Sequence, residues 1–190
     1  MKISAIIMAS GQSKRFGENK LLKKYGNKKI CEYTMDLVEE IPFHEKILVS
    51  AYDEVLKLGE KRKMITVKNN DNHRGKSRSI DLGLEKAEDV DGYLFFVADQ
   101  PLLKKETVEK IIDEFKKKRT IVLPRWKNQR GNPVLFPRRY KGKLQALDGD
   151  KGGACLIKEG NHFFVEVEEK EELWDIDTKE SYERLITHER

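Results

Sequence analysis

Residues 3–20 read ISAIIMASGQSKRFGENK. The apolar run Ile3 to Met8 is typical of a buried strand. The small residues at positions 9–11 let backbone N–H groups approach a ligand closely, and Arg15 and Lys20 supply cations for phosphate oxygens. Ligands of parallel α/β sheets bind at the carboxyl ends of the strands. This stretch therefore predicts a phosphate-binding loop, and a plain surface loop with turn glycines is the alternative.

Apolar strand-like segments and helical periodicity alternate along the rest of the chain. Further strands are expected at Lys46–Ser50, Met64–Lys68, Tyr93–Ala98, Thr120–Leu123, Pro133–Phe136 and His162–Val167. Helices are expected over Ile30–Ile41, Tyr52–Lys63, Ser77–Glu88 and Val108–Phe115, with a last one from Thr178. This alternation predicts an α/β fold, a Rossmann-like three-layer sandwich whose mostly parallel sheet is covered on both faces. We find no linker or repeat, and expect one domain over residues 1–190.

The composition limits the possible classes of protein. The 190 residues are 37% charged and 38% hydrophobic, which excludes a disordered chain. The longest apolar runs, Ala5–Ala9 and Tyr93–Ala98, fall far short of the ~20 residues of a membrane span. Cys31 and Cys155 are far apart and form no CxxC motif, which favours a reduced compartment. We find no targeting segment and expect a cytoplasmic protein without a membrane partner.

A second loop resembles part of a known phosphate-binding motif. Gly75-Lys76-Ser77 looks like the end of a P-loop, but the first glycine of that motif would stand where the chain has Asn70. We expect instead a helix whose N-terminus offers N–H groups and hydroxyls to a ligand, with Lys76 or Ser77 near the cap.

Two aspartates are candidates for holding Mg²⁺. Asp99 follows the apolar run Tyr93–Ala98, and magnesium is typically bound by one or two carboxylates plus substrate phosphates. In Trp174-Asp175-Ile176-Asp177, alternation in a short strand would put both aspartates on one face, so Asp177 is the second candidate ligand. The alternatives are structural: Asp99 as the cap of a helix starting near Lys105, and Asp177 as the N-cap of the last helix.

Basic residues are concentrated in one part of the chain. Between Phe115 and Leu147 there are eleven basic residues and no acid, although the whole chain has a net charge of only +5. Such a segment attracts a phosphorylated ligand or an acidic partner, or else is a solvated surface. Nucleic-acid binding is not expected, because no recognition motif accompanies the charge.

Taken together, these segments resemble the nucleotidyltransferases of molybdenum cofactor maturation. The first loop is similar to the superfamily signature L-x-x-G-x-S-x-R-x-G-x-x-K, with Met8 in place of the usual Leu. Within that superfamily the chain resembles the molybdenum cofactor cytidylyltransferases. The matching segments are Asn69 with Gly75-x-Ser77-x-Ser79-Ile80, Ala98–Leu103, Arg130–Phe136, Gly149–Gly152 and Asp175–Thr178.

The resemblance implies a fold, a reaction and a set of site residues. The fold is that of the nucleotide-diphospho-sugar transferases. The reaction is transfer of CMP from CTP to the molybdopterin cofactor, with release of pyrophosphate. By resemblance, the residues that bind the nucleotide are Met8, Ala9, Ser10, Gly11, Arg15, Lys20, Gly75, Ser77 and Ser79. The catalytic residues are Arg15, Lys20 and Asp99, and Asp99 and Asp177 hold Mg²⁺.

Several alternatives stay open at this stage. The cytidylyl group usually has Ala-Ala-Gly and the guanylyl relatives Ala-Gly-Gly where this chain has Ala9-Ser10-Gly11. The protein could therefore be a guanylyltransferase, or a sugar-phosphate nucleotidyltransferase. It could also be a non-catalytic module that delivers the cofactor to a molybdenum hydroxylase. We expect the basic segment from Arg125 to Arg139, with Arg130 and Arg138, to bind the pterin phosphate or an acidic acceptor enzyme.

Overall fold

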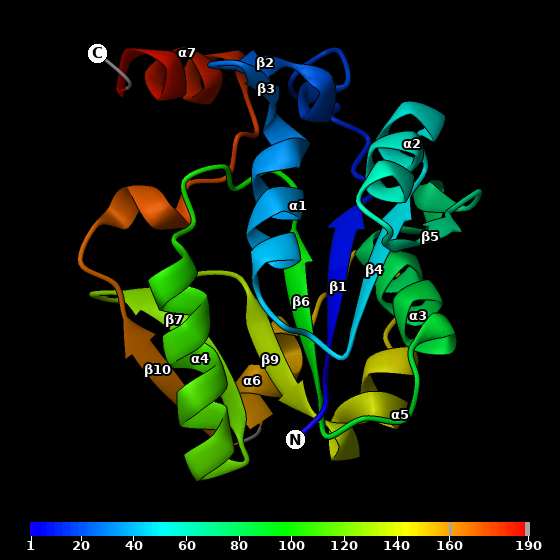
Figure 1. The fold of residues 1–190 in the computed structure, drawn as a ribbon, viewed down its shortest axis with the longest axis vertical. Coiled ribbons are helices and arrows are strands. Elements are labelled where there is room, and N and C mark those ends of the chain that lie inside the picture. Colours follow the sequence, from blue (N-terminus) through cyan, green and yellow to red (C-terminus); the bar gives the residue numbers. More distant parts are fainter. Residues whose placement is uncertain (160, 189–190) are drawn as a thin grey trace.

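The computed structural model describes residues 1–159 and 161–188. Its centre is an eight-stranded sheet in the order β10–β7–β9–β6–β1–β4–β5, with β8 paired beside β7 (Figure 1). The strands are β1 (Ile3–Ala9), β4 (Glu45–Ser50), β5 (Ile65–Lys68), β6 (Gly92–Val97), β7 (Ile121–Trp126), β8 (Gln129–Arg130), β9 (Val134–Pro137) and β10 (His162–Glu166). All run in one direction except β8 and β9, so the mostly parallel sheet is confirmed.

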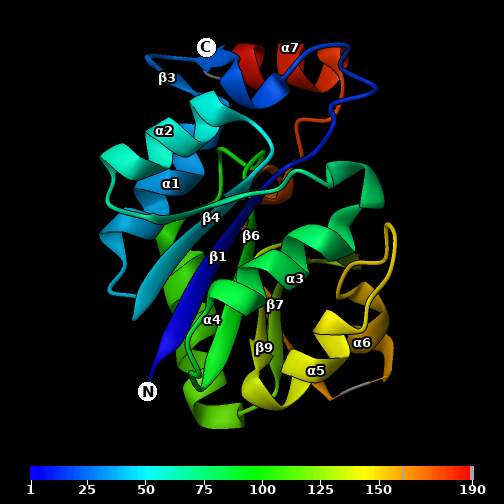
Figure 2. The same ribbon diagram turned by 90° about the vertical axis from the view of Figure 1, so that its right-hand side faces the viewer.

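Helices cover both faces of this sheet. One face carries α1 (Ile30–Glu40), α2 (Asp53–Lys61) and α4 (Lys105–Lys118), and the other carries α3 (Lys76–Lys86), α5 (Lys141–Gln145) and α6 (Ala154–Glu159), as Figure 2 shows with the two groups on opposite sides of the strands. The predicted three-layer α/β sandwich is therefore what the chain forms.

Along the central strands, apolar side chains point alternately to the two faces of the sheet. Both faces therefore need helices to cover them. In β1, Ile7 packs into the core on the α1 and α4 side, and its neighbour Ile6 packs into the core on the α3 side. In β6, Phe96 and Phe95 divide in the same way. Successive side chains of a strand point to opposite faces, so a run without polar residues is stable only between two layers.

The C-terminal part of the chain lies across the carboxyl edge of the sheet. Helix α7 (Lys179–His188) packs beside the small hairpin of β2 (Lys24–Tyr25) and β3 (Lys28–Lys29), at the top of Figure 1. A separate apolar cluster joins them, and its buried members are Phe16, Tyr25, Ile30, Ile176 and Leu185. This cluster fixes the segment before α7 directly above the ends of β1 and β6.

Some sequence expectations differ from the structure. The strand expected at Trp174–Asp177 is wrong, because this segment has no strand ladder, and its Ile176 N–H donates to the carbonyl of Asp99, just after β6. The two small hairpins and helices α5 and α6 were not predicted. Among the described residues, no helix is long and apolar enough to cross a bilayer.

Candidate active site

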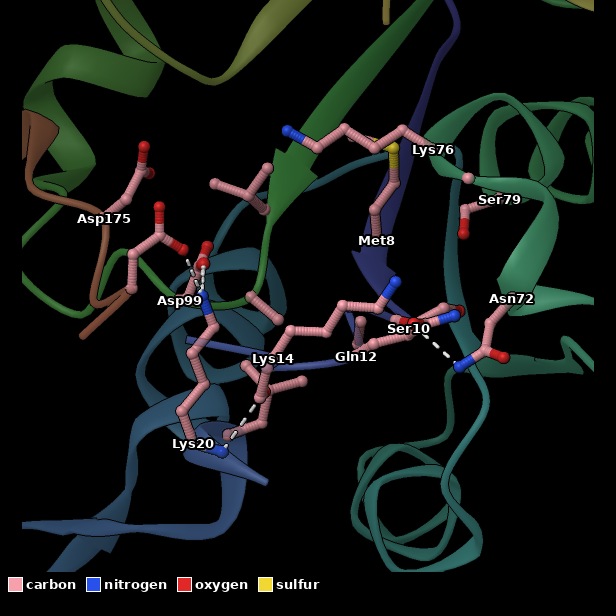
Figure 3. A pocket seen from close by; sticks show the side chains of 18 of the residues that line it. Met8, Ser10, Gln12, Lys14, Lys20, Asn72, Lys76, Ser79, Asp99 and Asp175 are labelled. Atoms are coloured by element: carbon pink, nitrogen blue, oxygen red, sulfur yellow. Dashed lines mark hydrogen bonds and ion pairs between the residues drawn. The ribbon is translucent and has the colours of Figure 1, made fainter. Parts of the chain in front are cut away.

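A pocket of about 370 Å³ opens at the carboxyl ends of β1 and β6 (Figure 3). It combines the loop after β1, the start of α3, the end of β6 and the segment before α7. Of the residues predicted to bind or act on the nucleotide, those that line it are Met8, Ala9, Ser10, Gly11, Arg15, Lys20, Gly75, Ser79, Asp99 and Asp177. Residues far apart in the sequence thus meet at the edge where ligands of such sheets bind.

Lys20 joins the two predicted metal ligands. Its side chain is buried, with the residue only 6% exposed. Its ammonium donates to Asp99 Oδ2 at 2.5 Å and to Asp177 Oδ1 at 2.7 Å (Figure 3 shows the contact with Asp99). Arg15 donates to the other oxygen of Asp177 at 2.7 Å. Two carboxylates and two cations therefore form one connected group at one end of the pocket.

The charges of this group stabilise one another. Burial alone would lower the pKa of Lys20, but the carboxylates of Asp99 and Asp177 outweigh it and raise that pKa above its ordinary value. Burial would likewise raise the pKa of Asp177, but Lys20 and then Arg15 hold it below its ordinary value. Both partners are therefore charged at neutral pH.

Asp175 is a further carboxylate that the sequence reading did not select. It lines the pocket beside Asp99 and lies on the same side of it in Figure 3. Surrounding protein atoms, and then the negative charges of Asp99 and Asp177, raise the pKa of Asp175 to about 6. The Asp175 residue is exposed at the mouth of the pocket. The sequence signal for Asp175 was its position two residues before Asp177, on the same face of the predicted strand.

The helix-cap alternatives for the aspartates are wrong. Helix α4 begins at Lys105 with Lys104 as its N-cap residue, and Asp99 lies before it at the end of β6. At the start of α7, the Ser181 N–H donates to the Thr178 hydroxyl, so Thr178 provides the capping oxygen. Neither Asp99 nor Asp177 is therefore the residue that caps the helix following it.

The two carboxylates suit a hard divalent cation. Asp99 Oδ2 and Asp177 Oδ1 point at one common position, which the Lys20 ammonium shares. Magnesium prefers oxygen ligands and often takes only one or two carboxylates, with phosphates completing its shell. Within residues 1–159 and 161–188, no group of three or more His, Cys, Asp or Glu is arranged to hold a metal ion by itself. The donor set fits an ion that arrives together with a phosphorylated ligand.

The opposite end of the pocket is built from short polar side chains. The Ser10 hydroxyl donates to the Val49 carbonyl at 3.4 Å, and its own carbonyl accepts from Asn72 Nδ2 at 3.3 Å (Figure 3). The buried Asn69 amide donates to the Ser79 hydroxyl at 3.1 Å. These bonds tie the loop after β1 to β4 and to the segment before α3, and tie Asn69, just after β5, to α3.

Gly75 and Ser77 support the loop that contains Gly149. Gly75 has a positive φ of 87°, and a Cβ there would lie 2.5 Å from the Gly149 carbonyl carbon. The Ser77 N–H donates to the Gly149 carbonyl at 3.1 Å, and Ser77, although predicted to touch the nucleotide, is buried and does not line the pocket. Helix α3 begins at Lys76 after the N-cap residue Gly75, so Lys76 and Ser77 lie next to the cap as predicted, although no side chain caps the helix.

The basic segment does not form one surface. Arg138 follows β9 at the amino end of β6, where its guanidinium pairs with Asp89 and its N–H donates to the Asp91 carbonyl. This is the edge of the sheet opposite to Asp99, so the expectation that Arg138 binds the pterin phosphate at the site is wrong. Arg130 lies in β8 at the carboxyl end of β7, with its guanidinium 5.5 Å from the Phe164 ring centre.

The fold and the site together define a class of protein. A small-residue loop after the first strand, cations on that loop and convergent carboxylates opposite it belong to α/β enzymes that act on phosphorylated nucleotides. A family model described as the MobA-like NTP transferase domain matches residues 5–164. The chain belongs to this family, and is a nucleotidyltransferase of the MobA-like type.

Individual relatives agree with this assignment. A probable molybdenum cofactor guanylyltransferase of Thermococcus gammatolerans is 31% identical, over 96% of this chain and 94% of its own length. A protein of the same description from Pyrococcus horikoshii is 27% identical, over 91% of this chain and 98% of its own. Among solved structures, Rv0371c of Mycobacterium tuberculosis superposes with a TM-score of 0.86 at 27% identity, with 98% of both chains covered. Another structure of Rv0371c is described as a complex with manganese.

Proposed function

We propose that residues 1–190 act as one nucleotidyltransferase domain that transfers GMP from GTP to the phosphate of the molybdopterin cofactor and releases pyrophosphate. The names of the curated relatives support GTP as the nucleotide. The sequence motifs favoured CTP, which remains the alternative. The observation that carries the proposal is the convergence of Lys20, Asp99 and Asp177 at one end of a pocket whose other end is the loop after β1. Two free cysteines fit the reducing cytoplasm in which we propose that it acts.

The proposed reaction is a single in-line displacement. An oxygen of the acceptor phosphate forms a bond to the α-phosphorus of the nucleotide, and the bond from that phosphorus to the bridging oxygen of the β-phosphate breaks. Pyrophosphate leaves with that bonding pair. Such transfers need little covalent chemistry from the protein, so positioning and charge neutralisation dominate.

Each charged side chain has a definite task in this scheme. Lys20 and Arg15 neutralise the triphosphate, and Asp99 and Asp177 would hold Mg²⁺ on it. When bound, the ion would supply charge stabilisation to the oxygens of the attacked α-phosphate and of the leaving pyrophosphate. Lys20 already lies within bonding distance of both carboxylates, so a small movement of its ammonium suffices to exchange carboxylate for phosphate contacts. A module that only delivered the cofactor would have no use for this arrangement.

Replacement of Asp99 tests the proposal. Asp99→Asn keeps the shape and leaves Lys20 its bond to Asp177, but removes a metal-binding charge. We expect kcat for pyrophosphate release to fall by about a hundredfold or more, with a thermal unfolding midpoint close to that of the wild type. The matched control is Asp113→Asn on the exposed side of α4, where Lys116 is the one ion-pair partner of the carboxylate among the described residues. Activity of Asp99→Asn equal to that of the control would show that Asp99 has no catalytic task.

A further inference from the structure

Three successive backbone carbonyls, those of residues 9–11 at the end of β1 and the start of its loop, each accept a hydrogen bond from a side chain elsewhere in the fold. The Ser50 hydroxyl, at the end of β4, donates to the first of them at 2.9 Å. Asn72 Nδ2 donates to the second at 3.3 Å (Figure 3), and the Tyr52 hydroxyl donates to the third at 2.8 Å. The backbone of the loop is therefore held from outside before any ligand binds.

The bond from Tyr52 decides which way one N–H of the loop points. A trans peptide unit directs its carbonyl and its N–H to opposite sides, and the unit that joins Gly11 to Gln12 is trans. Gly11 and Gln12 line the pocket, and Tyr52 does not. The Gly11 carbonyl is therefore directed away from the pocket, so the Gln12 N–H on the same unit points into it. Among the residues that the structure describes, this N–H has no acceptor.

We propose that Tyr52 is a positioning residue, whose hydroxyl holds the Gln12 N–H in place for a phosphate oxygen of the nucleotide. The surroundings suit such an anion, because Lys14 and Arg15 follow on the same loop and line the pocket. A donor that is already oriented loses less freedom when its ligand binds. The inference rests on the proposed nucleotidyl transfer, and adds to it a residue that does not itself touch the nucleotide.

Tyr52 is itself fixed in a position to donate. It is half-buried just after β4, where its N–H donates to the Ser50 hydroxyl at 3.1 Å and its ring packs against the core on the α1 side of the sheet. Burial raises the pKa of Tyr52 above its ordinary value, although the charge of Lys20 opposes this shift. The hydroxyl therefore keeps its proton at neutral pH and can donate to the Gly11 carbonyl.

Removal of the Tyr52 hydroxyl alone tests this inference. Tyr52→Phe keeps the ring and its packing but leaves the Gly11 carbonyl without its donor. Non-hydrolysable analogues of GTP and CTP are titrated calorimetrically in the presence of Mg²⁺, and Kd is compared for the analogue that the wild type binds more tightly. We expect this Kd to rise by about fivefold, which is the effect of one misplaced hydrogen-bond donor.

Tyr182→Phe is the matched control. The Tyr182 hydroxyl also donates to a backbone carbonyl, that of Lys24 at 2.6 Å, but Tyr182 does not line the pocket. The Kd of this variant should stay within about twofold of the wild type. The two variants should have similar thermal unfolding midpoints, because each loses one hydrogen bond at the surface. A loss of affinity confined to Tyr52→Phe then has its cause at the loop and not in the stability of the fold.

Two kinetic measurements complete the test. In pyrophosphate release, Tyr52→Phe should raise the KM for the nucleotide by about fivefold and keep kcat within about twofold, because the bound substrate and the transition state share the phosphate contact. Inorganic tripolyphosphate has no base, so its inhibition constant against the nucleotide should rise by a similar factor.

The inference is overturned if Tyr52→Phe binds the analogue as tightly as Tyr182→Phe does, or if its inhibition constant for tripolyphosphate is unchanged. Either result, together with cofactor-dependent pyrophosphate release by the wild type, would leave the proposed function intact. A wild type that neither binds a nucleotide analogue nor releases pyrophosphate would overturn both.

Discussion

Lys20 connects the loop after β1 to the carboxylates of Asp99 and Asp177. The Lys20 residue is almost entirely buried, so little water can reach its ammonium. Oxygens of Asp99 and Asp177 take the place of that water. A buried ion pair is retained only where its partners are well placed, and removal of one partner leaves an uncompensated charge. A divalent cation that binds both carboxylates must therefore displace Lys20, and the negative triphosphate is the group that can receive it.

Removal of the Lys20 charge should separate metal binding from nucleotide binding. In Lys20→Met the two carboxylates lose their shared cation, so we expect Mn²⁺ to bind without nucleotide about tenfold more tightly than to the wild type, while GTP affinity falls. Calorimetric titration of Mn²⁺ into the protein alone measures this. Lys14→Met is the matched control, since Lys14 lines the same pocket but makes no ion pair with a carboxylate among the described residues. Equal Mn²⁺ affinities in both variants would contradict this role of Lys20.

From residue types the sequence identified side chains that meet at one pocket, but it could not show their mutual contacts. Arg15, Lys20, Asp99 and Asp177 were selected by residue type and by their positions after predicted strands. Their mutual bonds were not predictable, because Lys20 is 79 residues from Asp99 and 157 from Asp177, and only the folded sheet brings them together. Ser77 was predicted to bind the nucleotide, and the structure shows its backbone N–H donating to the Gly149 carbonyl.

Glu172 connects the segment before α7 to the N-terminus of α4. It lies in the short helix η4 (Lys170–Leu173) and is only 4% exposed. Its Oε2 accepts from the Thr107 hydroxyl at 2.6 Å and from the Lys104 N–H at 3.3 Å, at the N-terminus of α4. A carboxylate there satisfies free N–H groups and the positive end of the helix dipole. The segment that carries Asp175 and Asp177 is thereby anchored on α4.

Loss of this anchor should destabilise the fold. Glu172→Ala leaves the first turn of α4 without its acceptor and opens a small cavity, so we expect the free energy of unfolding to fall by about 1–3 kcal/mol. Urea unfolding followed by circular dichroism measures the change. Glu168→Ala, an exposed acidic residue in the same acidic stretch, should shift it by less than about 0.5 kcal/mol. If the two variants unfolded alike, Glu172 would not anchor the segment.

The long elements could be predicted, but the short ones could not. The central strands are four to seven residues of buried apolar sequence, and the main helices carry a clear apolar face, so their periodicity identifies them. The hairpins of two-residue strands are too short to show any period. The segment Trp174–Asp177 alternates as a strand does, but it packs through Ile176 into the cluster beneath α7 instead of pairing with another strand.

The whole molecule distributes its charge in a way that the linear sequence conceals. The basic segment runs up β7 to the site edge and returns down the antiparallel β9 to the opposite edge. Arg125 and Arg130 therefore lie near the carboxyl edge, while Arg119 and Arg138 pair with acids at the amino edge. A charge run that spans two antiparallel strands cannot form one surface patch. The fold class, in contrast, depends on the order of strands and helices, which the sequence displays directly.

The most direct measurement is pyrophosphate release by the purified protein with Mg²⁺ and molybdopterin cofactor, with GTP, CTP, ATP and UTP compared in parallel. We expect release that requires the cofactor and is fastest with GTP. Cofactor-dependent release with CTP alone would keep the reaction and the site but correct the nucleotide. No release above the Asp99→Asn background with any of the four nucleotides would contradict the assignment as a molybdopterin nucleotidyltransferase.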